Sequence, residues 1–341
     1  MNDSVGGTTR RALGAAGLAA LLGSGAMGGA TAQPAPTAGA GSYPNRPIRL
    51  VVPLSPGGPG DILTRALVER VSPELGQPIV VENRPGANSN IGFEHGARAE
   101  PDGYTLLLGL APLTINPSLF ARVGYDPVRD FAPITLIGTF PLVLAVHPSV
   151  PAATVGEFIA HARANPGALT YGSNGIGSTP HLAGAMLDVM AGVRTVHVPY
   201  RGIAEAVVDL VAGRIQFAFP GPPVALPHAE AGRIRLLAVT SAARSTTAPG
   251  LPTMAEAGGL PGFEVSAWYA VLAPAGTPAP VVARLHDAFA GVLRRPETAA
   301  RWRTLGADVA WSESPAQFAA FIAADVAKWR QVLQQTGVRV D

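Results

Sequence analysis

Cysteine is absent from this chain of 341 residues. Its absence excludes disulfides, thiolate catalysis and zinc sites built on cysteine. Lysine is almost absent, with Lys328 as the only one, so a phosphate loop with its Walker lysine is excluded as well. The seven histidines are scattered and none falls in an H-E-x-x-H spacing, and we therefore expect no metal and no cofactor.

Charge and long apolar runs are also scarce. The formal net charge is only +2 and no basic cluster appears, so we expect no nucleic acid partner. Beyond the N-terminal segment, no apolar run reaches the length of a membrane span. About 300 residues remain after that segment, and a chain of this length is too long for one ordinary core, so two domains are expected.

The N-terminal segment has the pattern of an export signal. Arg10 and Arg11 precede an apolar stretch, and Ala30-Thr31-Ala32 supplies a cleavage pattern. The paired arginines favour a twin-arginine-like signal over a Sec signal. We expect this signal over 1–32, a disordered spacer over 33–42, and a protein that is soluble in the periplasm after cleavage near Ala32. The alternative is a membrane anchor, which the short, glycine-interrupted stretch disfavours.

Apolar runs alternate with helical patterns through the rest of the chain, which indicates α/β architecture. We expect strands at 48–54, 79–82, 104–109, 134–138, 142–146, 170–172, 195–198, 216–219, 236–239 and 265–273. The segments near 142–147 and 265–274 are candidates for crossing between domains. The predicted first domain is then discontinuous, holding 43–144 plus 267–341, and the second holds 145–266. Such a pair of domains places its ligand in the cleft between them, at the carboxyl ends of the strands.

Three sequence patterns mark helix starts. Thr154 and Glu157 form a capping box, and Thr277 places a cap before Pro278. Ser314 caps a helix that begins at Pro315.

Two strand–loop–helix units, about a hundred residues apart, are alike. In each, a buried strand runs into a loop of Gly, Ser, Asn or Pro that opens directly onto a helix, near Gly58 and near Ser178. Free N–H groups and the positive end of the helix dipole make such a junction a small anion site. In the second unit Thr179 is the expected N-cap, which leaves the N–H groups of His181 and Leu182 free. The alternative is that each loop is only a well-capped turn.

Several nearby side chains have two interpretations. Asp61 either caps its helix or receives a ligand hydroxyl, ammonium or water. Tyr200 follows a strand and can line the cleft, and Phe219 either contacts the ligand or packs at a strand end. Trp268 and Tyr269 lie on a proposed crossing strand, where core packing is favoured over ligand stacking. His181 has no nucleophile and orienting carboxylate in a recognisable triad.

A series of short strings, in order along 43–341, resembles the Bug-type family, the extracytoplasmic solute-binding proteins of tripartite tricarboxylate transporters. They include Pro56-Gly57-Gly58-Pro59-Gly60-Asp61, Val81-Glu82-Asn83-Arg84-Pro85-Gly86-Ala87, Pro101-Asp102-Gly103-Tyr104, His197-Val198-Pro199-Tyr200-Arg201-Gly202 and Pro252-Thr253-Met254-Ala255-Glu256-Ala257-Gly258.

The resemblance implies a type II periplasmic-binding-protein fold: two α/β domains joined by two crossover strands, with a ligand cleft between them. It implies capture of a small organic carboxylate, delivery to the membrane subunits of a tripartite tricarboxylate transporter, and no catalysis; we expect a monomer. Many relatives carry Phe-Asp-Asn where this chain has Phe219-Pro220-Gly221, so two polar side chains are missing at the far end of the ligand. The expected ligand-binding set is Ser55, Pro56, Gly57, Gly58, Asp61, Leu110, Ala111, Ser173, Asn174, Gly175, Gly177, Ser178, His181, Tyr200 and Phe219.

Two other functions stay open at this point. A ligand-loaded protein of this kind can dock on the outer domain of a sensor kinase instead of a permease. An exported hydrolase using His181 with Ser178 or Asp61 is a remote alternative, because no nucleophile–base–orienter set is visible.

Overall fold

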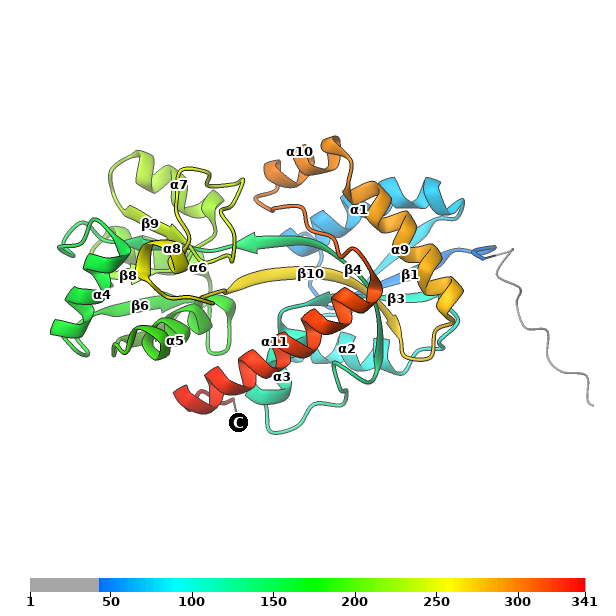
Figure 1. Ribbon diagram of the computed structural model, residues 1–341, viewed down its shortest axis with the longest axis horizontal. Helices are drawn as coiled ribbons and strands as arrows, with labels where there is room; N and C mark the ends of the chain where they lie inside the picture. Colours follow the sequence, from blue (N-terminus) through cyan, green and yellow to red (C-terminus); the bar gives the residue numbers. More distant parts are fainter. Residues whose placement is uncertain (1–42, 341) are drawn as a thin grey trace, which may run out of the picture. The chain divides into compact units, whose positions relative to one another are not determined.

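The computed structural model describes residues 43–340, so the expected export signal (1–32) and spacer (33–42) lie outside the described residues. Within these residues the chain forms two five-stranded sheets (Figure 1). The first has the order β2-β1-β3-β10-β4 and consists of β1 (Ile48–Val52), β2 (Ile79–Asn83), β3 (Thr105–Leu110), β4 (Phe131–Pro141) and β10 (Ser266–Pro274). The second has the order β7-β6-β8-β5-β9 and consists of β5 (Val143–Val146), β6 (Thr170–Ser173), β7 (Val196–Pro199), β8 (Phe217–Ala218) and β9 (Arg235–Val239).

Each sheet has a parallel part that carries a strand–loop–helix unit. Strands β1, β2 and β3 run parallel, as do β6, β7 and β8. The carboxyl ends of β1 and β3 therefore meet at one edge, and those of β6 and β7 meet at the corresponding edge of the second sheet. Antiparallel strands complete both sheets: β10 pairs with β3 and β4, and β5 pairs with β8 and β9.

The ten predicted strands all occur, with changed ends. The strand expected over 134–138 extends from Phe131 to Pro141 because it pairs with β10 along its length. The strand expected over 142–146 begins only at Val143. Leu142, between β4 and β5, gives its N–H to Thr240 Oγ1 at 3.0 Å and accepts the N–H of Thr240. The chain thus passes from the first sheet to the second at Leu142. The exact limits of the two domains remain a prediction.

Eleven α-helices and one 3₁₀ turn connect these strands within residues 43–340. They are α1 (Pro59–Leu75), η1 (Ala87–Ser89), α2 (Asn90–Ala97), α3 (Pro112–Leu119), α4 (Val155–Ala164), α5 (Thr179–Ala191), α6 (Ile203–Val211), α7 (Pro222–Glu230), α8 (Met254–Gly258), α9 (Ala279–Leu293), α10 (Pro296–Thr304) and α11 (Pro315–Thr336). None of them combines the length and apolar character needed to cross a membrane.

The three predicted helix starts differ in outcome. Ser314 is the N-cap of α11, as expected, and accepts the N–H of Gln317. Thr154 accepts the N–H of Glu157, but the Glu157 carboxylate accepts the N–H of Ala153, so the reciprocal half of the box is displaced by one residue. The prediction for Thr277 is wrong: Pro278 is the N-cap of α9, because the Thr277 hydroxyl donates backwards to the Pro274 carbonyl.

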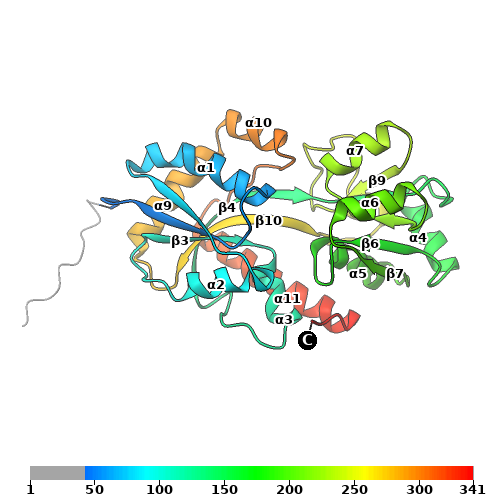
Figure 2. The ribbon, with the colours of Figure 1, turned by 180° about the vertical axis from the view of Figure 1, so that it is seen from behind.

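Buried side chains form three clusters. One lies between the first sheet and helices α1 and α9, and one lies between the second sheet and α6 (Leu50, Leu67, Phe289; Leu210, Ala218). Figure 2 shows α6 and α5 on opposite sides of β6. The third cluster is continuous from the first sheet to the second, through α3, α11 and α5. The two sheets therefore share one stretch of core beside the region where a cleft was expected.

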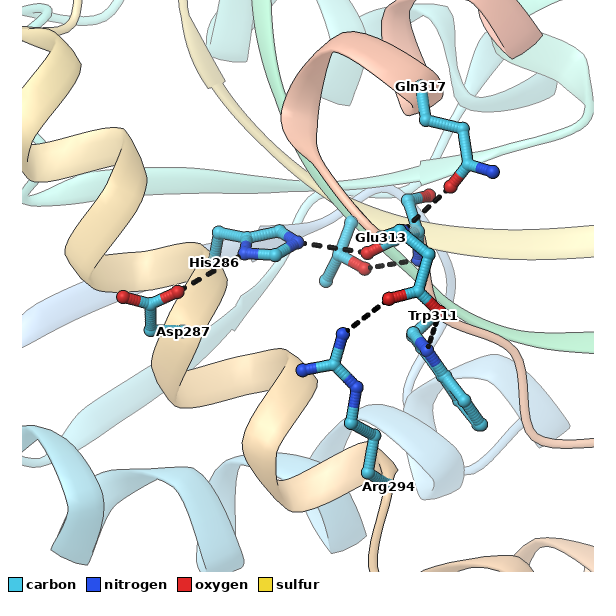
Figure 3. A network of polar contacts seen from close by, with 8 residues as sticks. His286, Asp287, Arg294, Trp311, Glu313 and Gln317 are labelled. Atoms are coloured by element: carbon cyan, nitrogen blue, oxygen red, sulfur yellow. Dashed lines mark hydrogen bonds and ion pairs between the residues drawn. The ribbon is translucent and has the colours of Figure 1, made fainter.

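The start of α11 is fixed by a polar network (Figure 3). His286 on α9 binds the Ser312 carbonyl at 2.9 Å, and the Ser312 N–H donates to Thr135 on β4. Arg294 and Trp311 both donate to the Glu313 carboxylate. These contacts tie α11 to α9 and to the first sheet, and so set the position of the α11 residues that lie behind the site described next.

Candidate ligand-binding site

The first strand–loop–helix unit runs from β1 through Ser55–Gly58 into α1. Gly58 is the N-cap of α1 in an extended conformation, and Pro59 occupies the first helical position. The N–H of Ile62 closes the first turn on the Gly58 carbonyl, whereas the N–H groups of Gly60 and Asp61 have no acceptor among the described residues. The loop has the expected helix start, but its residues 55–57 are exposed.

Asp61 is buried at this helix start, with 2% of its surface exposed. One carboxylate oxygen accepts the N–H of Gly57 at 3.0 Å and the Arg65 Nε–H at 2.9 Å, and the other accepts the Asn83 amide at 2.9 Å. Burial favours the neutral acid, but these hydrogen bonds outweigh it and lower the pKa of Asp61 to about 2. Both oxygens therefore accept hydrogen bonds inside the protein, as the capping interpretation requires, and a ligand contact of Asp61 stays a prediction.

The second unit runs from β6 through 174–178 into α5. Here the predicted cap is wrong by one residue: Ser178 is the N-cap, Thr179 is the first helical residue and Pro180 the second. The N–H of Leu182 donates to the Ser178 carbonyl at 2.9 Å, so this N–H is taken. Among the described residues, the N–H groups of Thr179 and His181 at this helix start have no acceptor.

His181 is held as a neutral ring. Its Nδ1 accepts the N–H of Gly177 at 3.0 Å, and the ring stacks on His197 at 3.9 Å between centroids. Burial, followed by the neighbouring His197 ring, lowers the pKa of His181 to about 4. His197 in turn lies 2.6 Å from the hydroxyl of Ser173. The imidazole therefore supports the loop without adding charge at neutral pH.

The two units share one backbone arrangement. In each, a glycine in the left-handed region, Gly57 or Gly177, gives its N–H to the third residue of the following helix, Asp61 or His181. A side chain is unfavourable at both glycine positions because φ is +82° and +76°. At Gly177 the space is also filled, since a Cβ would lie 2.3 Å from Leu119 Cδ2 of α3.

A cavity of about 170 Å³ lies between the second loop, the start of α3 and strand β10. Five of its lining residues belong to the predicted site: Leu110, Ala111, Asn174, Gly177 and Ser178. The others are Asn88, Pro112, Ile115, Thr179, Pro180, Ala267, Trp268 and Tyr269. The second loop and α3 thus meet in one hollow, whereas the first loop, which the paired-loop prediction places opposite the second, does not line it.

The remaining predicted site residues do not line this cavity. They are Ser55, Pro56, Gly57, Gly58, Asp61, Ser173, Gly175, His181, Tyr200 and Phe219. Phe219 is fully buried and meets Phe217 edge-on, and the Tyr200 hydroxyl donates to Asp209 at 2.8 Å. The first loop reaches the cavity only indirectly: a Cβ on Gly60 would lie 2.6 Å from the ring of Tyr269, which lines the hollow.

Sequence reasoning left Asn88 out of the expected site. It is the middle of three consecutive non-glycine residues in the left-handed region, Ala87, Asn88 and Ser89, with φ of 47°, 51° and 75°. The fully buried Asn116 holds this turn, exchanging hydrogen bonds with the Asn88 side chain and carbonyl at 2.8 and 2.9 Å. A backbone outlier beside a cavity is a signal of function, but it is visible only in three dimensions.

A buried carboxylate lies behind the cavity wall. Asp325 on α11 accepts the Thr114 hydroxyl at 2.6 Å and the Trp268 indole N–H at 3.1 Å. Its other oxygen lies 2.6 Å from the ammonium of Lys328, the sole lysine. This pair is neutral overall and joins α3, β10 and α11.

Among the described residues, Ser178 and His181 make separate hydrogen bonds and do not bond to each other. The Ser178 hydroxyl donates to the Gly175 carbonyl at 2.7 Å, so it is not directed at His181. Between residues 43 and 340, no three His, Asp or Glu side chains gather as metal ligands.

The chain matches known proteins along most of its length. Residues 63–338 match the family model described as the tripartite tricarboxylate transporter family receptor. Protein BugT of Bordetella pertussis is 36% identical over 313 residues, covering 91% of this chain and 95% of BugT.

Solved structures give the same result. A protein of R. palustris solved with adipate is 37% identical with a TM-score of 0.71, covering 86% of this chain and 98% of its own. The periplasmic binding protein BugD is 36% identical with a TM-score of 0.67, and the match covers 87% of this chain and 99% of BugD. The expected two-domain periplasmic-binding-protein fold is confirmed by these neighbours. The chain therefore belongs to the Bug-type solute-binding receptors of the tripartite tricarboxylate transporter family.

Proposed function

We propose that this protein captures a small organic carboxylate in the cavity beside α5 and delivers it to the membrane subunits of a tripartite tricarboxylate-type transporter. The observation that carries the proposal is the start of α5, where the N–H groups of Thr179 and His181 have no acceptor between residues 43 and 340 and Thr179 lines the cavity. A helix start with free donors binds anions without any Lys or Arg. The relative solved with adipate adds support, because adipate is a carboxylate.

The first loop completes the proposed site in a closed form. Its residues 55–57 are exposed, and the adjoining Gly60 packs on Tyr269 at the cavity wall. Approach of this loop to the ligand would stabilise the closed form by the affinity that it adds. The predicted roles of Ser55, Pro56, Gly57 and Gly58 belong to that closed form.

The protein is proposed to bind without catalysis, as a monomer, in the periplasm. The Ser178 hydroxyl donates to the Gly175 carbonyl, which supports the proposal that Ser178 and His181 do not act as a catalytic pair. Intact-mass measurement of the exported protein tests cleavage near Ala32, and light scattering after gel filtration tests the monomer.

Ligand capture is tested by native mass spectrometry followed by a thermal-shift screen of carboxylic acids. A rise in melting temperature that saturates with one acid supports the proposal, since a ligand of the folded state raises its stability. No adduct and no shift with a broad panel of acids would contradict it.

The role of the α5 donors is tested by Thr179→Pro, which removes one free N–H at a position where helices accept proline. The matched control is Ala279→Pro, which also places proline at the first position of a helix, before an existing proline and on the far side of the first sheet's core. Thr179→Pro is expected to weaken carboxylate binding about tenfold, and Ala279→Pro to leave it unchanged. Equal affinity in the two variants would show that the α5 start does not hold the ligand.

A further inference from the structure

A second and larger hollow, the α5–α11 hollow, lies between α5, strand β7 and the end of α11, which approaches α5 (Figure 1). Its volume is about 430 Å³, and it shares no lining residue with the cavity proposed for the carboxylate. His181, Ala185, Asp188 and Val189 line it from α5, because residues three or four positions apart lie on one face of a helix. Carboxylate capture at the α5 start therefore leaves this hollow unused.

The α5–α11 hollow contains one carboxylate and no opposite charge. Asp188 is half-buried; one of its oxygens accepts the N–H of Thr195 at 3.2 Å and the other accepts the Thr195 hydroxyl at 2.9 Å. No Lys or Arg lines the hollow, and among residues 43–340 no cation pairs with Asp188. Burial raises the pKa of Asp188, against the effect of the Thr195 hydrogen bonds. A carboxylate in this environment is stabilised by a cation that a ligand brings.

A buried donor lies at the other end of the hollow. His181 has 5% of its surface exposed, and its Nδ1 accepts the N–H of Gly177 at 3.0 Å. The neutral ring therefore carries its proton on Nε2. Nε2 has no acceptor among the described residues, yet it is not one of the atoms that are closed off from solvent. Since His181 lines the α5–α11 hollow and not the carboxylate cavity, this N–H is available to an acceptor in the hollow.

The spacing on α5 limits the length of a molecule that reaches both groups. Asp188 follows His181 by two helical turns, which is about 10 Å along the axis. After one hydrogen bond of about 2.9 Å at each end, about 5 Å remains, which is the length of a chain of about three or four carbons. The hollow therefore fits a short carbon chain with a polar group at each end.

An organic molecule supplies the missing cation better than a metal ion does. Among the described residues, no three His, Asp or Glu side chains gather as metal ligands. Four of the lining residues are aliphatic: Ala185, Val189, Val193 and Val338. These side chains contact carbon, which a metal ion lacks. An ammonium group on a carbon chain matches both the charge of Asp188 and the apolar surface beside it.

From these observations we infer that the α5–α11 hollow is a second small-molecule site, whose ligand is an organic ammonium compound with a hydrogen-bond acceptor about three or four carbons away. The ammonium group binds Asp188, the acceptor binds the Nε2–H of His181, and the carbon chain lies against Val189 and Val193. The inference goes beyond the proposed function, because it does not depend on what binds at the α5 start.

His181 couples this site to the second loop. Its Nε2 faces the α5–α11 hollow, while its Nδ1 holds the N–H of Gly177, which lines the carboxylate cavity. Hydrogen bonds in a chain polarise one another, so an acceptor on Nε2–H makes Nδ1 a stronger acceptor. A molecule in the hollow therefore strengthens the hydrogen bond that holds Gly177.

The test maps binding on the mature protein by two-dimensional NMR of the backbone amides. The probes are 3-amino-1-propanol and 4-amino-1-butanol, and the control is 1,4-butanediol, which matches the second probe in length but has no charge. Saturable shifts are expected at Asp188, Thr195 and Gln335, and at Gly177 through His181. The diol is expected to bind at least about tenfold more weakly than 4-amino-1-butanol.

Three results would count against the inference. Absence of saturable shifts at Asp188, Thr195 and Gln335 with both amino alcohols would overturn it. Equal affinity for the diol would overturn the part assigned to the ammonium group. Saturable shifts at Asp188 with an unchanged Gly177 amide would overturn the coupling to the second loop.

A matched pair of variants tests the carboxylate. Asp188→Asn removes the charge and keeps the shape and an acceptor for Thr195, so it is expected to weaken amino alcohol binding at least about tenfold. Glu205→Gln is the control, because Glu205 is an exposed carboxylate on α6, which lies on the opposite side of β6 from α5 (Figure 2). Unchanged binding in a folded Asp188→Asn protein contradicts the inference. If Asp188→Asn does not fold, the comparison of amino alcohol with diol on the parent protein decides the question.

Discussion

The two strand–loop–helix units solve one backbone problem with different chemistry. In each unit the N–H of a left-handed glycine needs an acceptor. The acceptor is the side chain four residues later, at the third position of the helix. The first unit uses a carboxylate, Asp61, and the second an imidazole, His181. The carboxylate brings a negative charge, paired with Arg65, to its helix start, whereas the neutral imidazole brings none. Loops that look equivalent in backbone are therefore held by different chemistry, and the difference lies in one residue of each.

Acidification should give the largest difference between the two units in their contribution to the free energy of unfolding. The pKa of His181 is about 4 in the folded protein and 6.5 ordinarily, so the unfolded chain binds more protons between these values. The stabilising contribution of His181 is complete above about pH 6.5 and is lost as pH falls toward 4. This contribution to the free energy of unfolding is at most about 3 kcal/mol. Asp61 keeps its stabilising contribution through this range. Its pKa of about 2 lies below the ordinary 3.8, so the contribution of Asp61 is lost only as pH falls below 3.8.

Urea unfolding at a series of pH values measures this dependence. His181→Asn retains an acceptor that does not titrate, and it should flatten the curve between pH 6.5 and 4. Part of the slope should remain, because burial also lowers the pKa of His197. A curve for His181→Asn as steep as that of the parent protein would assign the effect to other groups.

The two glycines should differ when each is replaced by alanine. Gly177→Ala combines a left-handed backbone with a Cβ placed against Leu119 and should cost about 2–3 kcal/mol of unfolding free energy. Gly57→Ala has the same backbone penalty, but no atom lies within 4 Å of its Cβ, so about 1 kcal/mol is expected. Chemical denaturation of both variants gives the difference. Equal losses would mean that the contact with Leu119 relaxes without cost.

Removal of the Asp61 side chain has a smaller expected effect. Asp61→Ala leaves the Gly57 N–H and the Asn83 amide without their acceptor, and should lower the free energy of unfolding by about 2 kcal/mol. Asp61→Asn, which preserves one acceptor, should lower it by about half as much. Thermal unfolding in the absence of ligand compares the two. If Asp61→Ala is as stable as the parent protein, the buried cluster is not the anchor of the first loop.

Much of the fold followed from local patterns. The ten strands were predicted because runs of Val, Leu and Ile between turn residues identify buried strands without any knowledge of their partners. Their ends were less predictable: β4 is longer than its apolar run because pairing with β10 extends it. The Thr277 cap failed for a related reason, since its hydroxyl is used by the preceding turn.

The candidate site was predicted in part. The glycines and hydroxyls of the second loop were found because they are consecutive in sequence, and five predicted residues line the cavity. Ile115 and Asn88 were left out of the prediction because the packing of α3 against η1, which brings them to this cavity, is not visible in the sequence. Tyr200 and Phe219 do not line this cavity and contact Asp209 and Phe217, and their expected place at the ligand stays a prediction.

The left-handed turn Ala87–Ser89 limits how this receptor can diversify. Three adjacent residues with positive φ accept Gly, Asn or Asp readily, but β-branched residues are strongly disfavoured there. The left-handed main chain thus restricts which side chains a substitution can bring to this edge of the cavity. If the proposed site is this cavity, new ligand preferences are more accessible through Ile115 or Ala267, which line it from a helix and a strand.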